Sequence, residues 1–102
     1  MISQDKRDEL ILEHGRVAAV KAGDDYIVCR PPKFAEMQRF ATKLDKDVLL
    51  AGRELVLATV VYPERDRVKS MLDGEYSMAV ATLADRIQEL AGSKLEAEVW
   101  GN

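Results

Sequence analysis

The sequence predicts an α+β fold that is mainly helical, with a short N-terminal helix and a β-hairpin followed by a bundle of about four helices. Three observations lead to this prediction. Apolar residues recur at helical spacing over most of the chain after residue 33. Small and β-branched residues flank a Gly-Asp pair near residue 23. The 102 residues, 47% of them hydrophobic, suffice for one modest core and leave no room for a second domain.

Capping and turn residues define the first elements. Ser3, with acidic residues after it, predicts a short helix that stops at Gly15. Residues 16–30 then change to small and β-branched types around Gly23-Asp24, which suits a two-residue type II′ turn of a β-hairpin. In that register the face predicted to be buried contains Ala18, Val20, Ile27 and Cys29, with Ala18 opposite Cys29.

An amphipathic helix is predicted after the hairpin. Pro31-Pro32 ends the second strand because proline lacks the N–H donor, and Pro32 suits the first turn of a helix. The apolar stripe of this helix contains Phe34, Met37, Phe40, Ala41 and Leu44.

The third helix is expected to be the most buried element. Asp47 can cap it, and its length favours a helix over residues 48 to about 62. Residues 55–62 are rich in Val and Thr, so a buried strand is the alternative there. The apolar face of this helix contains Leu49, Leu50, Val56, Leu57, Val60 and Val61.

Two further helices complete the predicted bundle. Pro63 ends the third helix, and residues 64–72 form a short charged helix that stops at Asp73-Gly74. Ser77 can cap the last helix, whose apolar positions are Val80, Leu83, Ala84, Ile87, Leu90 and Ala91.

Gly92 is placed to end the last helix, so we expect a single domain over 1–92 and a C-terminal tail over 93–102. Residues 95–99 alternate between apolar and polar types, which is compatible with a strand, a helical extension or a disordered end.

Composition and charge argue against several function classes. The net charge is −3, and the 15 basic residues are interleaved with 18 acidic ones, which is unlike a nucleic-acid-binding surface. The longest nearly apolar run, 55–62, is far shorter than the roughly 18 residues that cross a membrane, and the polar start is not a signal peptide. A single cysteine and a single histidine exclude an intrachain disulfide and a Cys/His zinc site within one chain.

Reactive side chains do not form a catalytic pattern. Cys29 and His14 are the only pair of reactive types, and the hairpin register separates them by roughly 13 Å at about 3.3 Å per residue. Basic residues alternate with the carboxylates Glu64, Asp66, Asp73 and Glu75, which favours a solvated ion-pair face over a metal site. We therefore expect a protein that is not an enzyme and holds no cofactor or metal.

Apolar side chains that a small domain does not easily bury are the candidates for protein binding. They are Met37, Tyr62, Leu95, Val99 and Trp100. Packing of Met37 in the core and of Trp100 onto its own domain are the competing interpretations. We also expect the chain to form a homo-oligomer through Leu95, Val99 and Trp100.

Several segments together resemble the bacteriophage tail assembly chaperones of long-tailed phages and prophages. The resemblance spans nearly the whole chain, and its most specific element is Val60-Val61-Tyr62-Pro63-Glu64 at the end of an apolar helix. The other segments are Glu13-His14-Gly15, Ile27-Val28-Cys29-Arg30-Pro31-Pro32, Lys33-Phe34 and Ala91-Gly92. This chain departs from a frequent version of the family by continuing from Ser93 to Asn102.

The resemblance implies a binding function without catalysis, in the cytoplasm of a host bacterium. Such chaperones coat the tape measure protein, a long helical rod, and keep it soluble until tail tube subunits polymerise around it. A longer, frameshifted form can also recruit the tail tube protein. The implied partners are thus the tape measure protein and, for the longer form, the tail tube protein, with no nucleic acid and no membrane.

Other classes stay open at the level of sequence. The first alternative is a structural phage protein, such as a head-tail connector or a tail completion protein that assembles on the particle. A small host regulator or toxin-antitoxin partner and an enzyme with an unrecognised site are further alternatives, but no residue pattern favours either.

Overall fold

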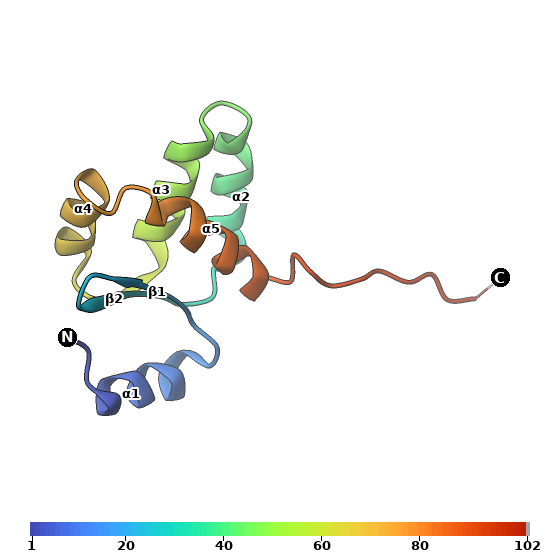
Figure 1. Ribbon diagram of the computed structural model, residues 1–102. Helices are drawn as coiled ribbons and strands as arrows, with labels where there is room; N and C mark the ends of the chain where they lie inside the picture. Colours follow the sequence, from blue (N-terminus) through green and yellow to red (C-terminus); the bar gives the residue numbers. More distant parts are fainter. Residues whose placement is uncertain (102) are drawn as a thin grey trace.

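A computed structural model describes residues 1–101 as five helices and a three-stranded antiparallel sheet (Figure 1). This α+β, mainly helical architecture is the predicted one, with a helix and a hairpin ahead of four further helices. The elements in chain order are α1 Gln4–His14, β1 Ala18–Ala22, β2 Asp25–Cys29, α2 Phe34–Leu44, α3 Val48–Thr59, β3 Val60–Tyr62, α4 Arg65–Asp73 and α5 Ala79–Leu90.

The hairpin has the predicted register. Ala18 pairs with Cys29, Val20 with Ile27, and Ala22 with Asp25 across the two-residue turn. Gly23 has a φ of 64°, which the first central position of a type II′ turn requires and which a side chain would strain.

The third helix is shorter than predicted, and a strand follows it. Helix α3 ends at Thr59, where Val60 takes an extended conformation, and Val60–Tyr62 pairs antiparallel with β2. The expectation of a helix to about Tyr62 is therefore wrong for its last turn. The β-branched valines suit a strand, and pairing satisfies backbone groups of β2 that the hairpin leaves open.

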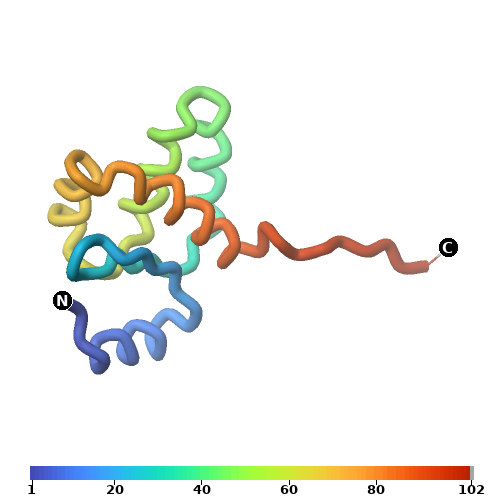
Figure 2. The backbone as a smooth tube through the Cα atoms, viewed as in Figure 1, coloured from blue at the N-terminus to red at the C-terminus, as the bar shows by residue number. Residues whose placement is uncertain are grey.

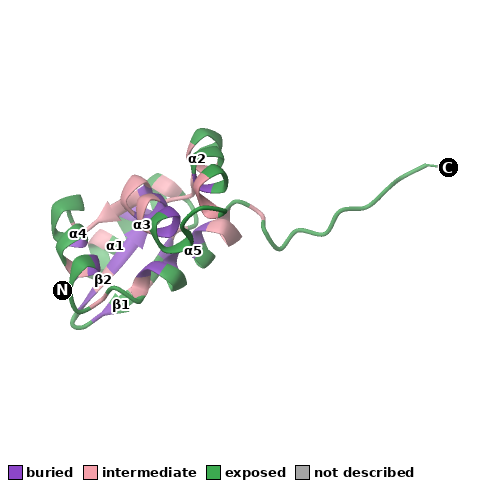
Figure 3. Cartoon of the chain, turned by 90° about the horizontal axis from the view of Figure 1, so that it is seen from above, coloured by how far each residue is buried: buried purple, intermediate pink, exposed green. Residues whose placement is uncertain are grey.

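Helices cover both faces of the sheet (Figures 1 and 2). On one face, Ile27 and Cys29 belong to the main core together with residues of α3, α4 and α5, including Val56, Val68 and Leu83. On the other face, α1 completes a smaller apolar cluster of Ile2, Leu10 and Val28, with Val17, Tyr26, Val61 and Tyr62 packed against it. Purple segments in Figure 3 therefore concentrate on β2, α3 and the inner side of α5.

Three local predictions differ from the structure. Ser77 does not cap the last helix, because α5 begins at Ala79 and its N-cap is Met78 without a side-chain hydrogen bond. Pro32 lies before the N-cap Lys33 rather than in the first turn of α2. Phe34, the first residue of α2, is 78% exposed, so it is not part of the buried stripe.

The last helix ends as predicted. Gly92 has a φ of 94°, its N–H donates to the Glu89 carbonyl, and the Ser93 N–H donates to the Gln88 carbonyl at 3.1 Å. This pair of bonds is a Schellman motif, which closes α5 and sets the direction of the tail. Residues 95–101 have no regular structure and run away from the domain (Figures 1 and 3).

Candidate functional site

Helices α3 and α5 lie very close where they cross, because Gly52 has no side chain. A Cβ atom at Gly52 would lie 3.0 Å from a methyl carbon of Val80 and 3.4 Å from the Cβ of Ala84. This close approach fixes the two helices side by side. Their N-terminal turns consequently form the two walls of a surface groove.

Exposed apolar side chains lie along this groove and next to it in the chain. Val48, Leu49 and Leu50 on α3 are 63%, 67% and 42% exposed, and Met78 beside α5 is 80% exposed. We call these four residues the apolar rim. Exposed apolar groups that are contiguous, unlike scattered single ones, are typical of protein-binding surfaces.

Two hollows lie on either side of Leu49 and Val80. One of about 350 Å³ is lined by Asp47, Leu49, Leu50, Arg53, Leu72, Ser77 and Val80. The other, of about 180 Å³, extends to the second helix and is lined by Phe40, Leu44, Val48, Leu49, Gly52, Val80, Ala81, Ala84, Asp85 and Gln88. Both hollows include Leu49 and Val80, so they adjoin each other across α3 and α5, and we call the two hollows together the groove.

The apolar rim is accompanied by few charges. Arg53 is held by Asp73, with the guanidinium nitrogen 2.6 Å from a carboxylate oxygen. The Asp47 carboxylate accepts a hydrogen bond from the Leu50 N–H at 3.0 Å and caps α3. Two of the charges that line the groove are therefore already engaged within the domain, which leaves apolar contact as its main means of recognition.

Three consecutive apolar residues in the sequence, Val48-Leu49-Leu50, already indicate that part of this segment is exposed. Successive helical residues are separated by about 100°, so three in a row cannot all face the core. The structure buries Ala51, Gly52, Leu55, Val56 and Thr59 instead. Leu49 and Leu50 are thus not part of the buried face predicted for this helix.

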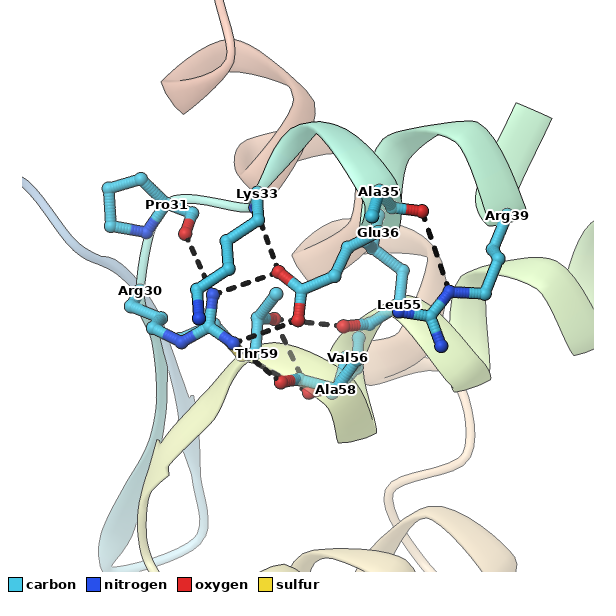
Figure 4. A network of polar contacts seen from close by, with 11 residues as sticks. Arg30, Pro31, Lys33, Ala35, Glu36, Arg39, Leu55, Val56, Ala58 and Thr59 are labelled. Carbon is cyan, nitrogen blue, oxygen red and sulfur yellow. Dashed lines mark hydrogen bonds and ion pairs between the residues drawn. The ribbon is translucent and has the colours of Figure 1, made fainter.

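A polar network lies where the end of β2 meets α2 and α3 (Figure 4). The Arg30 guanidinium, at the end of β2, donates to both Glu36 carboxylate oxygens at 2.9 and 2.8 Å and to the Ala58 carbonyl at 3.0 Å. Glu36 also accepts from the Lys33 N–H at 2.8 Å. This network ties the sheet to α2 and α3.

Ionisation of Glu36 is favoured by that geometry. The hydrogen bonds from Arg30 outweigh the effect of burial and lower the pKa of Glu36 from 4.5 to about 2. The same contact raises the pKa of Arg30. Both side chains are mostly covered, with exposed fractions of 21% for Arg30 and 10% for Glu36.

A second polar cluster joins the start of the chain to the sheet. The Asp25 carboxylate is buried and accepts hydrogen bonds from the Ile2 N–H at 3.0 Å, the Tyr26 N–H at 2.9 Å and the Tyr62 hydroxyl at 3.0 Å. Burial alone would raise the pKa of Asp25, but these hydrogen bonds lower it overall. Asp25 therefore fixes β3 and the segment before α1 against the hairpin.

The five candidate binding residues lie in three separate places. Met37 packs against the main core, and Tyr62 packs against the smaller cluster with its hydroxyl on Asp25. Leu95, Val99 and Trp100 are 83%, 97% and 86% exposed on the tail, and Trp100 does not fold back onto the domain. None of the five contributes to the lining of the groove.

The reactive residues are positioned away from the groove as well. Cys29 is fully buried in the main core, and burial raises the pKa of its thiol to about 11. His14 lies at the end of α1 and contacts Glu13 at 3.7 Å. Among residues 1–101, no cluster of three or more His, Cys, Asp and Glu side chains could hold a metal ion.

No helix within residues 1–101 is both long enough and apolar enough to cross a membrane.

Comparisons with known proteins support the fold. The structure is similar to that of an uncharacterised protein, rbstp2171 from Bacillus stearothermophilus, with a TM-score of 0.71 and 21% sequence identity. The similarity covers 92% of this chain and 99% of the other. No family model matches the sequence, and no curated protein matches it. At this identity the similarity establishes a shared fold and nothing about function.

Proposed function

We propose that this protein is a bacteriophage tail assembly chaperone that binds the tape measure protein and keeps it soluble during tail assembly. One observation supports a binding role above all others: the exposed apolar residues Val48, Leu49 and Leu50 line a groove between two helices, and exposed Met78 follows the lining residue Ser77 in the chain. The resemblance of the sequence to the chaperone family supplies the identity of the partner.

An amphipathic helix is the partner that suits such a groove. In helix-in-groove recognition, residues at i, i+3, i+4 and i+7 of the bound helix insert into an apolar cleft. A tape measure protein is a long helical rod that presents such stripes. Contact through leucine, valine and methionine side chains tolerates changes of sequence along the rod, because Met78 adapts its shape readily and most of the groove lining is apolar.

Co-expression tests this proposal. The chain is produced together with overlapping segments of the tape measure protein, and we expect at least one segment to become soluble and to co-purify. Leu49→Asp places a charge at the centre of the groove and should weaken binding by about tenfold or more.

Leu12→Asp is the matched control for this substitution. Leu12 is also an exposed helical leucine, 89% exposed on α1, and it does not line the groove. Equal loss of binding in both variants would argue against the groove as the binding site. Failure of every segment to bind the unmodified chain would overturn the chaperone proposal.

The protein composition of the finished phage particle distinguishes a chaperone from the alternative, a structural phage protein. A chaperone leaves before the particle is finished, whereas a head-tail connector or tail completion protein remains in it. Detection of this chain in purified virions by mass spectrometry would favour the structural protein.

A further inference from the structure

Strand β1 has a free edge. The sheet order is β1-β2-β3, so β1 is bonded on one side only. In a two-residue hairpin the pair beside the turn exchanges hydrogen bonds, and alternate pairs follow, so Ala22, Val20 and Ala18 bond to β2. Ala19 and Lys21 therefore direct their N–H and C=O groups outward, and both residues are exposed.

The free edge borders a hollow where β1 meets the end of α5. This hollow, of about 230 Å³, is lined by Arg16, Val17, Ala18, Ala19, Arg86, Glu89 and Leu90. Arg16 is exposed and forms no ion pair within residues 1–101. An unbonded strand edge beside a positive charge is suited to an extended, acidic segment.

The C-terminal tail has the matching properties. Residues 95–99 alternate, so in an extended conformation Leu95, Ala97 and Val99 lie on one face and Glu96 and Glu98 on the other. Leu95 and Val99 are almost fully exposed, and the segment has no regular structure in the single chain. Such a segment gains backbone hydrogen bonds by pairing with a strand edge.

The two faces of the tail correspond to the two faces of β1. Arg16, which precedes β1, lines the hollow beside α5 together with Arg86. Val17 and Ala19 project to the side of α1, where they border an apolar hollow with Ile11, which is 52% exposed. A strand added at this edge can place its glutamates beside Arg16 and its apolar residues beside Ala19 and Ile11, while Arg86 is already paired with Glu89.

We propose that residues 94–100 of one copy of this chain add as a strand to the β1 edge of a second copy. A second copy is favoured over the same chain because of the direction of the tail. The Schellman bonds at Gly92 and the hydrogen bond from the Leu95 N–H to the Gly92 carbonyl, 3.1 Å long, send the tail away from its own sheet (Figure 1). Reciprocal exchange gives a symmetric dimer with two such contacts.

Sedimentation equilibrium over a range of concentrations tests the proposal. The full chain should dimerise reversibly. Ala19→Pro removes the outward N–H at the centre of the edge without removing a bond to β2, and should raise the dimer dissociation constant by about tenfold or more. Ala19→Val is the matched control, because it keeps the N–H and suits a strand, and it should dimerise like the unmodified chain.

A mixing experiment separates the edge from the tail. Val99→Asp places a charge on the apolar face of the tail, and this variant alone should also dimerise weakly. Mixed with Ala19→Pro, it should form a heterodimer more readily than either variant self-associates, because one intact edge then meets one intact tail. Circular dichroism and thermal unfolding of both variants verify that each is folded.

Three results would overturn the proposal. The first is a chain that stays monomeric at every concentration. The second is a dimer that Ala19→Pro and Val99→Asp leave unchanged while Leu49→Asp dissolves it, which would assign the contact to the groove. The third is protection of tail amides from hydrogen exchange in the monomer, which would mean that the tail pairs with its own β1. Tape measure binding is measured separately, so failure of this proposal and failure of the chaperone proposal can be told apart.

Discussion

The ion pair between Arg30 and Glu36 connects three elements through two side chains. Arg30 lies just after β2, Glu36 lies in the first turn of α2, and the Ala58 carbonyl belongs to the last turn of α3. The Glu36 carboxylate accepts two guanidinium hydrogen bonds in a mostly covered position. Removing such a charge destabilises a protein more than removing an exposed one, because the guanidinium is left without a partner charge.

Glu36→Gln should therefore destabilise the domain by about 2 kcal/mol at about pH 7. The pKa of Glu36 is lower in the folded state, about 2, than its ordinary value of 4.5. The contribution of the Glu36 charge to the free energy of unfolding is thus fully present above pH 4.5 and is lost as the pH falls towards 2. Urea unfolding of both proteins over this range should show the difference between them shrinking as the pH falls.

Glu75→Gln is the control for that series, since Glu75 is exposed. Its effect on stability should stay within about 0.5 kcal/mol. A Glu36→Gln effect that does not depend on pH would mean that shape, rather than charge, accounts for the loss.

Cys29 should react slowly with thiol reagents in the folded protein. It has no exposed surface, and its pKa of about 11 leaves almost no thiolate at neutral pH. Labelling with an aromatic disulfide reagent should therefore become fast only in denaturant. Rapid labelling of the native protein would show that the main core opens readily or that the thiol is accessible.

At the scale of the element, α3 has one part that stabilises the domain and one part that faces solvent. Val56 is fully buried, whereas Val48 is 63% exposed in the apolar rim. Val56→Ala should cost about 2 kcal/mol, and Val48→Ala less than about 0.5 kcal/mol. Thermal unfolding measures both, and similar losses in the two variants would contradict the burial pattern of this helix.

Several elements that depend on local chemistry were predictable, although the Ser77 cap was not, and the strand at residues 60–62 was foreseen only as an alternative to helix. Ser3, Gly23 and Gly92 act through their own backbone or neighbouring N–H groups, so the first helix, the hairpin register and the end of α5 followed from the sequence. Residues 60–62 form a strand because β2 lies beside them, a contact over 30 positions along the chain that periodicity cannot detect.

The candidate site was predictable only in part for the same reason. The tail residues Leu95, Val99 and Trp100 are exposed, as their place outside the helical pattern suggested. The groove depends on how closely α3 and α5 approach at Gly52, and no local pattern reports that distance. Tyr62 and Met37 are held by packing partners that become adjacent only in the fold.

At the scale of the whole molecule, the two faces of the sheet are covered very unequally. The main core unites four helices with the sheet, and α3 alone contributes five buried residues to the domain. On the other face, Leu10 is the buried residue of α1, supported by Ile2 and by the bond from the Ile2 N–H to Asp25. A cover attached at so few points should open without unfolding the rest.

Hydrogen exchange measures this difference directly. Amides of α1 should exchange through local opening, faster than amides of α3, which should need global unfolding. Leu10→Ala removes the main contact of α1 with the sheet and should accelerate exchange in α1 by about tenfold or more while leaving α3 less affected. Leu83→Ala, in the main core, should accelerate exchange in α3 because it lowers the free energy of global unfolding, and should leave the local opening of α1 less affected. If Leu10→Ala accelerated α3 as strongly as α1, the main core and the smaller apolar cluster would unfold as one cooperative unit with one free energy of unfolding.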